Sequence, residues 1–109
     1  MSQGAIQRWD ELPLEKVTEM VSRKVMEDDR MSLTQVHLKR GAHVPVHQHD
    51  YDQMIYVLQG RLACIVSGRE VEVGEGDVLS VRAGARHQAV ALEDAFQLVI
   101  SNRAVPPAD

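Results

Sequence analysis

Residues 43–60 read HVPVHQHDYDQMIYVLQG, and this stretch decides the fold. It holds His47 and His49 one residue apart, followed by an alternating apolar run that opens at Gln53 and closes at a glycine. On a β-strand, residues i and i+2 share a face with Cα atoms roughly 6.5–7 Å apart, so the two imidazoles can converge on one ion. A turn over residues 50–52 would bring Gln53 to the start of the next strand, opposite the histidines. The stretch therefore predicts two strands with a metal site between them.

The same alternation continues on both sides of this stretch. Residues 14–19 fit either a helix or a strand, whereas 21–26 are expected to be extended. Period-2 runs separated by glycines or by an acidic turn occupy residues 31–39, 52–60, 61–67, 71–74, 76–84, 86–92 and 95–101. Roughly seven to nine short strands with almost no helical periodicity indicate an all-β sandwich or barrel.

The chain has 109 residues, which is room for one domain. We place the conserved-barrel core at about residues 31–101, between a short N-terminal arm and a flexible C-terminal tail. The formal net charge is −4 with both signs scattered along the chain, so neither a nucleic acid nor a membrane is expected as a partner.

The single cysteine, Cys64, excludes an intrachain disulfide and a cysteine zinc cluster. The opening residues carry charges where a signal peptide needs an apolar segment, and no run reaches about 18 apolar residues. We therefore expect a reduced, cytoplasmic protein.

A third histidine stands far downstream, in the stretch GARHQAV of residues 84–90. There His87 follows a glycine turn and opens another strand. Three imidazoles and one oxygen donor can fill half an octahedron or slightly more, which leaves positions open to water or substrate, as in catalytic metal sites. Such ligation suits one divalent ion of Mn, Fe, Ni or Zn, and the absence of a thiolate argues against Cu(I).

Glycines and histidines recur at fixed spacing in two patterns, Gly41-x5-His47-x-His49-x3-Gln53-x6-Gly60 and Gly76-x5-Arg82-x-Gly84-x2-His87. The first pattern resembles the first cupin motif and the second resembles the second. The resemblance implies a single cupin domain over residues 1–109, folded as a jelly-roll β-barrel (double-stranded β-helix). It also implies a metal held by His47, His49, Gln53 and His87. Gln53 stands at the usual glutamate position, Arg82 at the usual proline and Ala91 at the usual asparagine.

Further segments resemble the small pectin-degradation cupins: His37 and residues 23–26, 47–50, 52–53 and 89–94. Those proteins open the ring of 4,5-unsaturated monouronates to linear keto-deoxyuronates with a metal on three histidines and one glutamine. The resemblance implies an isomerase or lyase of carbohydrate metabolism that acts on a small-molecule sugar acid, and we expect a homodimer. That group carries an acidic residue, an aromatic and an arginine around the end of its final strand. Here the region reads LVISNRAVPPAD, and only a shifted Arg103 could replace the arginine.

The neutral Gln53 changes the chemistry expected of the site. It leaves one more positive charge on the ion than a glutamate would, which makes the ion a stronger Lewis acid and lowers the pKa of a bound hydroxyl. We expect polarisation chemistry, such as isomerisation or elimination beside a carbonyl. The alternatives are an Fe- or Mn-dependent oxidoreductase of the dioxygenase kind, and a non-catalytic cupin that binds a metal or a small ligand.

The catalytic group itself is unknown from the sequence, because no carboxylate base is evident at the pocket. Arg23, Arg82 and Arg103 are candidate clamps for a substrate carboxylate, since a guanidinium fork matches that shape. His37 is a candidate pocket residue, and its alternative role is a half-buried structural histidine. His43 is expected to be exposed in the loop before the ligand strand.

Alternation also assigns side chains to the two faces of the strand that follows Gln53. Ile55 and Val57 are expected to point inward and Tyr56 outward. Cys64 is expected to be a small core residue.

Overall fold

Alternating side chains fold the chain into strands, as the sequence predicted. The computed structural model describes residues 4–103, and within them it has ten strands and one short 3-10 helix. The elements are η1 Trp9–Glu11, β1 Glu15–Thr18, β2 Val21–Glu27, β3 Ser32–Leu38, β4 His43–His47, β5 Gln53–Gln59, β6 Arg61–Val66, β7 Arg69–Gly74, β8 Val78–Val81, β9 His87–Ala91 and β10 Ala95–Ser101. The ambiguous segment 14–19 is β1 for most of its length. The expected C-terminal tail lies outside the described residues from residue 104 on.

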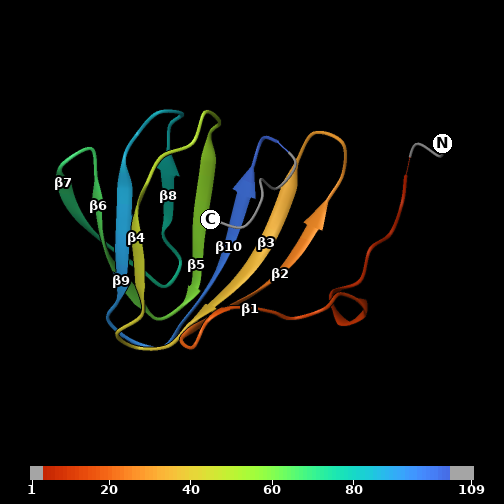
Figure 1. The fold of residues 1–109 in the computed structure, drawn as a ribbon, viewed down its shortest axis with the longest axis horizontal. Helices are drawn as coiled ribbons and strands as arrows, with labels where there is room; N and C mark the ends of the chain where they lie inside the picture. The colour runs from red at the N-terminus through yellow and green to blue at the C-terminus, as the bar shows by residue number, and fades with distance from the viewer. Residues whose placement is uncertain (1–3, 104–109) are drawn as a thin grey trace.

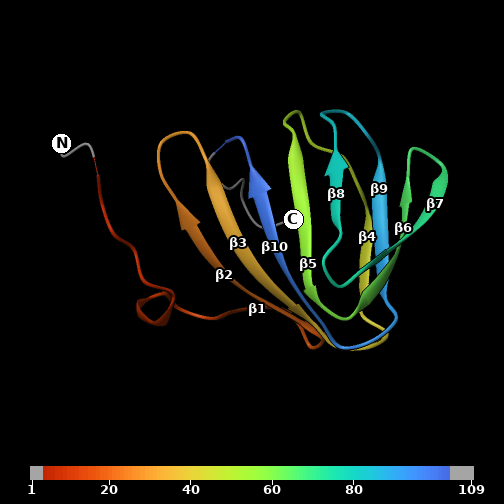
Figure 2. The same cartoon turned by 180° about the vertical axis from the view of Figure 1, so that it is seen from behind.

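Two antiparallel sheets face each other (Figure 1). One has six strands in the order β1-β2-β3-β10-β5-β8, and the other has four in the order β4-β9-β6-β7. Because β4, β6 and β9 each follow a strand of the larger sheet, the chain crosses repeatedly between the sheets, as in a jelly roll. Figure 2 shows the same arrangement from behind, with the N-terminal arm extending away from β1. No helix among the described residues is long and apolar enough to cross a membrane.

The apolar core closes one end of the space between the sheets. Its buried members are Leu38, Ala42, Val57, Leu62, Cys64, Val73, Ala91 and Ala95. Several of them stand where strands begin or end, beside the turns that join β3 to β4, β5 to β6, and β9 to β10. The opposite end carries the turns that join β4 to β5 and β8 to β9. The core therefore seals one end, and the space toward the other end is left for a site.

At the closed end, the turns of two strand pairs pack backbone against backbone. Gly60 alone joins β5 to β6 with φ +83°, a conformation that favours glycine. A Cβ at this position would lie 2.3 Å from the carbonyl oxygen of Asp94 and 2.9 Å from Cα of Ala95. The Asp94 carboxylate in turn accepts a hydrogen bond of 2.8 Å from the backbone N–H of Arg40. Position 60 thus requires glycine both for its positive φ and because the neighbouring backbone leaves no space for a Cβ.

We expect Gly60→Ala to destabilise the protein by more than the about 1–2 kcal/mol that a left-handed residue costs by itself, because the methyl group also collides with rigid backbone. Gly68→Ala is the matched control, since Gly68 has φ +80° and a methyl group there would meet nothing within 4 Å. The free energy of unfolding in urea measures both variants. Equal losses for the two variants would contradict the close approach at Gly60.

Candidate metal centre

Three histidines meet at the open end of the space between the sheets. The ring nitrogens that His47, His49 and His87 offer all lie within 4.8 Å of one another. His47 ends β4 and His87 begins β9, and the two are direct partners in the antiparallel register, with ring centroids 3.9 Å apart. Nitrogens bound to one ion at about 2.1 Å lie at most about 4.2 Å apart, so small ring rotations would bring all three to binding distance.

The two strand-borne histidines are held in the same way. His47 Nδ1 lies 2.8 Å from the carbonyl oxygen of Pro45, and His87 Nδ1 lies 2.9 Å from that of Ala85. A carbonyl can only accept, so Nδ1 is the donor in both contacts and Nε2 would be the nitrogen that binds an ion. Metal-binding histidines are oriented by this kind of contact. The donor set therefore fits a divalent ion.

His49 is positioned differently from the sequence prediction. The prediction placed it on one strand with His47, but β4 ends at His47 and His49 lies in the following loop. A backbone hydrogen bond of 2.7 Å from the N–H of Gly84 to the carbonyl of His49 joins this loop to the β8–β9 turn. The buried ring of Tyr51 stacks on the imidazole, with centroids 4.6 Å apart and planes 22° apart. Tertiary contacts, not strand pleating, place the third imidazole.

The loop is held further by Asp52, which the sequence placed in the turn over residues 50–52. Its Oδ1 accepts a hydrogen bond of 2.8 Å from the N–H of Ala83. Its own N–H donates to Oδ1 of Asn102 at 3.1 Å, and its carbonyl accepts from the N–H of Asn102 at 3.3 Å. An Asp directly before a strand is a common turn signal, but its partners lie far along the chain and could not be inferred.

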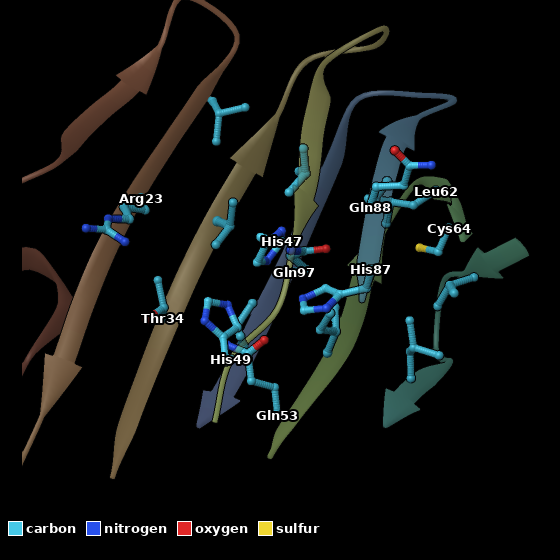
Figure 3. A pocket seen from close by; sticks show the side chains of 18 of the residues that line it. Arg23, Thr34, His47, His49, Gln53, Leu62, Cys64, His87, Gln88 and Gln97 are labelled. Carbon is cyan, nitrogen blue, oxygen red and sulfur yellow. The ribbon is translucent and has the colours of Figure 1, made fainter. Parts of the chain in front are cut away.

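Gln53 begins β5, as predicted, and lines the same cavity as the three histidines. Its Nε2 donates a hydrogen bond of 3.0 Å to Oγ of Ser101, its direct partner on β10. Because the amide nitrogen is engaged with the serine, Oε1 is left as the atom for an ion. In Figure 3 the three imidazoles face a common space, and Gln53 extends toward it from its strand. The structure brings the four predicted ligands together, and metal binding by them stays a prediction.

The cavity between the sheets has a volume of about 220 Å³ and suits a small molecule. Much of its wall is apolar, and among the described residues that line it there is no Asp, Glu or Lys. Arg23 is the one arginine among them. A charged ligand in this cavity would thus meet imidazoles, amides, hydroxyls and one guanidinium.

The three catalytic candidates occupy three different places. Arg23 lines the cavity away from the histidines, and its Nε donates a 2.8 Å hydrogen bond to Oε1 of Glu15 on β1 (Figure 3). Arg103 pairs with Asp50 at 2.9 Å and lies over the Tyr51 ring, outside the cavity lining. His37 is exposed and stacks on a phenylalanine, Phe96, at 4.4 Å. It is not half-buried, because β3 turns Thr34 and Val36 to the cavity and His37 to the opposite face.

Other expectations also meet mixed outcomes. His43 is exposed as predicted, yet it is the first residue of β4 and lines the cavity, so the expectation of a loop position is wrong. Arg82 is exposed and does not line the cavity. Tyr56 points outward, whereas Ile55 and Val57 line the cavity, which confirms the alternation.

Cys64 is a buried core residue, as predicted, and its thiol borders the cavity. Burial raises the pKa of the thiol, because the thiolate would be removed from water. The folded protein therefore keeps a neutral thiol at a pH where the unfolded chain, with a pKa of about 8.5, begins to ionise.

We expect iodoacetamide at pH 8 to alkylate Cys64 in the native protein at least about tenfold more slowly than in the urea-unfolded chain. The thiolate fraction and the access of the reagent both fall on folding. Mass spectrometry of samples quenched over time gives the rates. Equal rates in the two states would show that the thiol is neither buried nor shifted.

Comparison with known proteins agrees with this geometry. The family described as cupin domain matches residues 34–101. KdgF from a Halomonas species is 28% identical, with a TM-score of 0.84 over 93% of this chain and 96% of that chain. An RmlC-like cupin from Shewanella frigidimarina is 19% identical, with a TM-score of 0.86 over 94% and 93% of the two chains.

Two further results bear on the breadth of the likeness. An oxalate decarboxylase variant from Bacillus subtilis is 19% identical, with a TM-score of 0.79 over 94% of this chain and 31% of that chain. At that identity the likeness concerns the fold alone. No curated protein matches the chain.

Proposed function

The chain belongs to the cupin family, and we propose that it is a metal-dependent enzyme that opens the ring of a small sugar acid such as a 4,5-unsaturated uronate. The observation that carries the proposal is the cluster of three imidazoles, within 4.8 Å of one another, on a cavity that no carboxylate lines among the described residues. The likeness of residues 23–26, 47–50 and 89–94 to the pectin-degradation cupins supports the substrate class. The 28% identity to KdgF over nearly the whole chain supports it further.

His47, His49, His87 and the Oε1 atom of Gln53 would hold one divalent ion of Mn, Fe, Ni or Zn. When bound, the ion would supply Lewis acidity that stabilises negative charge on a substrate oxygen. All four ligands are neutral, so the protein contributes no negative charge to balance the ion. A ligand that brings its own negative charge is favoured in such a cavity, since charges interact more strongly where water is scarce.

Arg23 strengthens this preference for an anion. Its Nε is engaged by Glu15, and a planar guanidinium has further N–H groups that can meet other oxygens of such a ligand. Its side chain is only 18% exposed, so a pairing there would be partly shielded from water. The apolar side chains that line the cavity, among them Val36 beside Arg23, would exclude water from the rest of the substrate.

The proposed reaction is an isomerisation that needs no oxidant. The hydroxyl on C1 of the ring loses its proton, the bond between C1 and the ring oxygen breaks, and an aldehyde forms. The freed ring oxygen becomes the enol oxygen on C5, and a proton added at C4 gives the ketone. One proton leaves and one returns, so the composition of the substrate does not change. The chain would bind and orient the sugar acid so that these changes occur in a confined cavity.

Removal of an imidazole tests the metal centre. We expect purified wild-type protein to carry about one transition-metal ion per chain, and His49→Ala to lose affinity by more than about 100-fold. His37→Ala is the matched control, because His37 faces away from the cavity and should leave the metal content unchanged. Elemental analysis and chelator competition measure both. Wild-type protein without stoichiometric metal, prepared in the absence of chelators, would end the proposal.

The reaction is followed by the loss of ultraviolet absorbance as the conjugated C4–C5 double bond of an unsaturated uronate disappears. Metal-loaded wild type should accelerate this loss without consuming oxygen. Oxygen uptake would instead identify an oxidoreductase. A uronate that binds metal-loaded protein and is recovered unchanged after long incubation would favour a binding protein.

Arg23 should affect substrate binding more than the chemical step. We expect Arg23→Met to raise KM about tenfold while kcat changes less, because Arg23 lies away from the histidines (Figure 3) and would hold a part of the substrate remote from the reacting atoms. Arg69→Met, at an exposed position of β7, is the control. A fall in kcat with an unchanged KM would contradict this role for Arg23.

A further inference from the structure

A glutamine amide is buried in the cavity wall, and its oxygen has no hydrogen-bond partner among the described residues. Gln97 lies in the middle of β10 with only 7% of its surface exposed, and it lines the cavity. Its Oε1 is buried and has no hydrogen-bond partner among the described residues. Such an acceptor loses its hydration on folding and gains nothing in return. In Figure 3 the side chain extends from β10 toward the space that the imidazoles face.

The surroundings of Gln97 give the amide no structural role. Its direct partners on the two neighbouring strands are Val36 and Val57, and the next inward residue of β10 is Val99. An apolar side chain of the same length would fill this patch of valines without the unmet acceptor. A buried polar group that packing does not need marks a place where function overrides stability.

The chemistry of the amide defines what it can bind. Its oxygen needs a hydrogen-bond donor, and a carboxylate group supplies none. A hydroxyl supplies a donor to Oε1 and can accept from Nε2. Oε1 is buried, so a hydroxyl in the cavity reaches it when the amide turns about its last torsion, which is broad and roughly two-fold in glutamine.

We propose that Gln97 selects a polyhydroxylated acid by binding a hydroxyl that is not part of the metal chelate. This inference rests on the proposed function, because it assumes that the anionic end of the ligand sits at the histidines. It goes further by naming the residue that distinguishes a sugar acid from a simple carboxylate such as oxalate. Oxalate would occupy the coordination positions of the ion and leave Oε1 of Gln97 without a hydrogen-bond partner.

Two anions with the same chelating group test the inference. Glycolate chelates through its carboxylate and its only hydroxyl, whereas gluconate has the same group and several further hydroxyls. Calorimetric titration of metal-loaded wild type, Gln97→Met and Gln35→Met gives the affinities. Gln35 is the matched control, since it lies on β3 between the cavity-lining residues Thr34 and Val36 and faces the other side of the sheet.

We expect Gln97→Met to weaken gluconate binding about tenfold and to leave glycolate binding within about twofold. Gln35→Met should change neither affinity. The thermal midpoint of Gln97→Met without ligand should equal or exceed that of wild type, because the substitution removes an unmet buried acceptor. A lower midpoint would assign the amide a structural role and overturn the inference.

The outcomes separate the two proposals. If neither anion binds metal-loaded wild type, the inference about Gln97 fails, while the metal analysis and the ring-opening assay decide the proposed function separately. If both anions bind and Gln97→Met weakens both equally, or weakens neither, the inference alone is wrong.

Discussion

The antiparallel pairing of β4 with β9 is the constraint on which the site depends. It sets His47 directly opposite His87, so two imidazoles from segments far apart in the sequence share one small volume. Each ring is then turned by a carbonyl two residues before it in the chain, at Pro45 and at Ala85. A shift of one residue in this pairing would send one of the two rings to the other face of the sheet. The core at the closed end holds the register by packing the same strands.

The two ends of the space between the sheets differ in structure: one holds the apolar core and the other holds the histidines. At the closed end, apolar residues pack together and Gly60 approaches the backbone of Asp94 closely. At the open end, the turns are joined to one another by hydrogen bonds, among them the one from Gly84 to His49. These hydrogen bonds therefore hold the imidazole of His49 in place although it lies in a loop and not on a strand. This division lets a small domain keep both a core and a cavity.

Charge and polarity inside the cavity point to the same kind of ligand. The hydrogen bond from Gln53 to Ser101 leaves the amide oxygen as a neutral ligand for an ion, and no carboxylate is among the described residues that line the cavity. The oxygen of Gln97 has no hydrogen-bond partner among the described residues, and the partly buried guanidinium of Arg23, paired with Glu15, borders the same cavity. Together they describe a cavity suited to an anion that also carries hydroxyls.

The sequence by itself determined most of the strands and turns, because period-2 alternation and glycine spacing are local signals. The spacing of the histidines and the family resemblance identified the three that cluster. The sequence also placed Ile55 and Val57 inward and Tyr56 outward, since adjacent residues of a strand must face opposite sides. Only the tertiary structure decided that His49 is held from a loop, that His37 faces away from the cavity, and that the buried Oε1 of Gln97 has no partner among the described residues. Alternation separates the two faces of a strand, but what lies across a cavity depends on contacts between residues distant in the chain, and no local pattern records them.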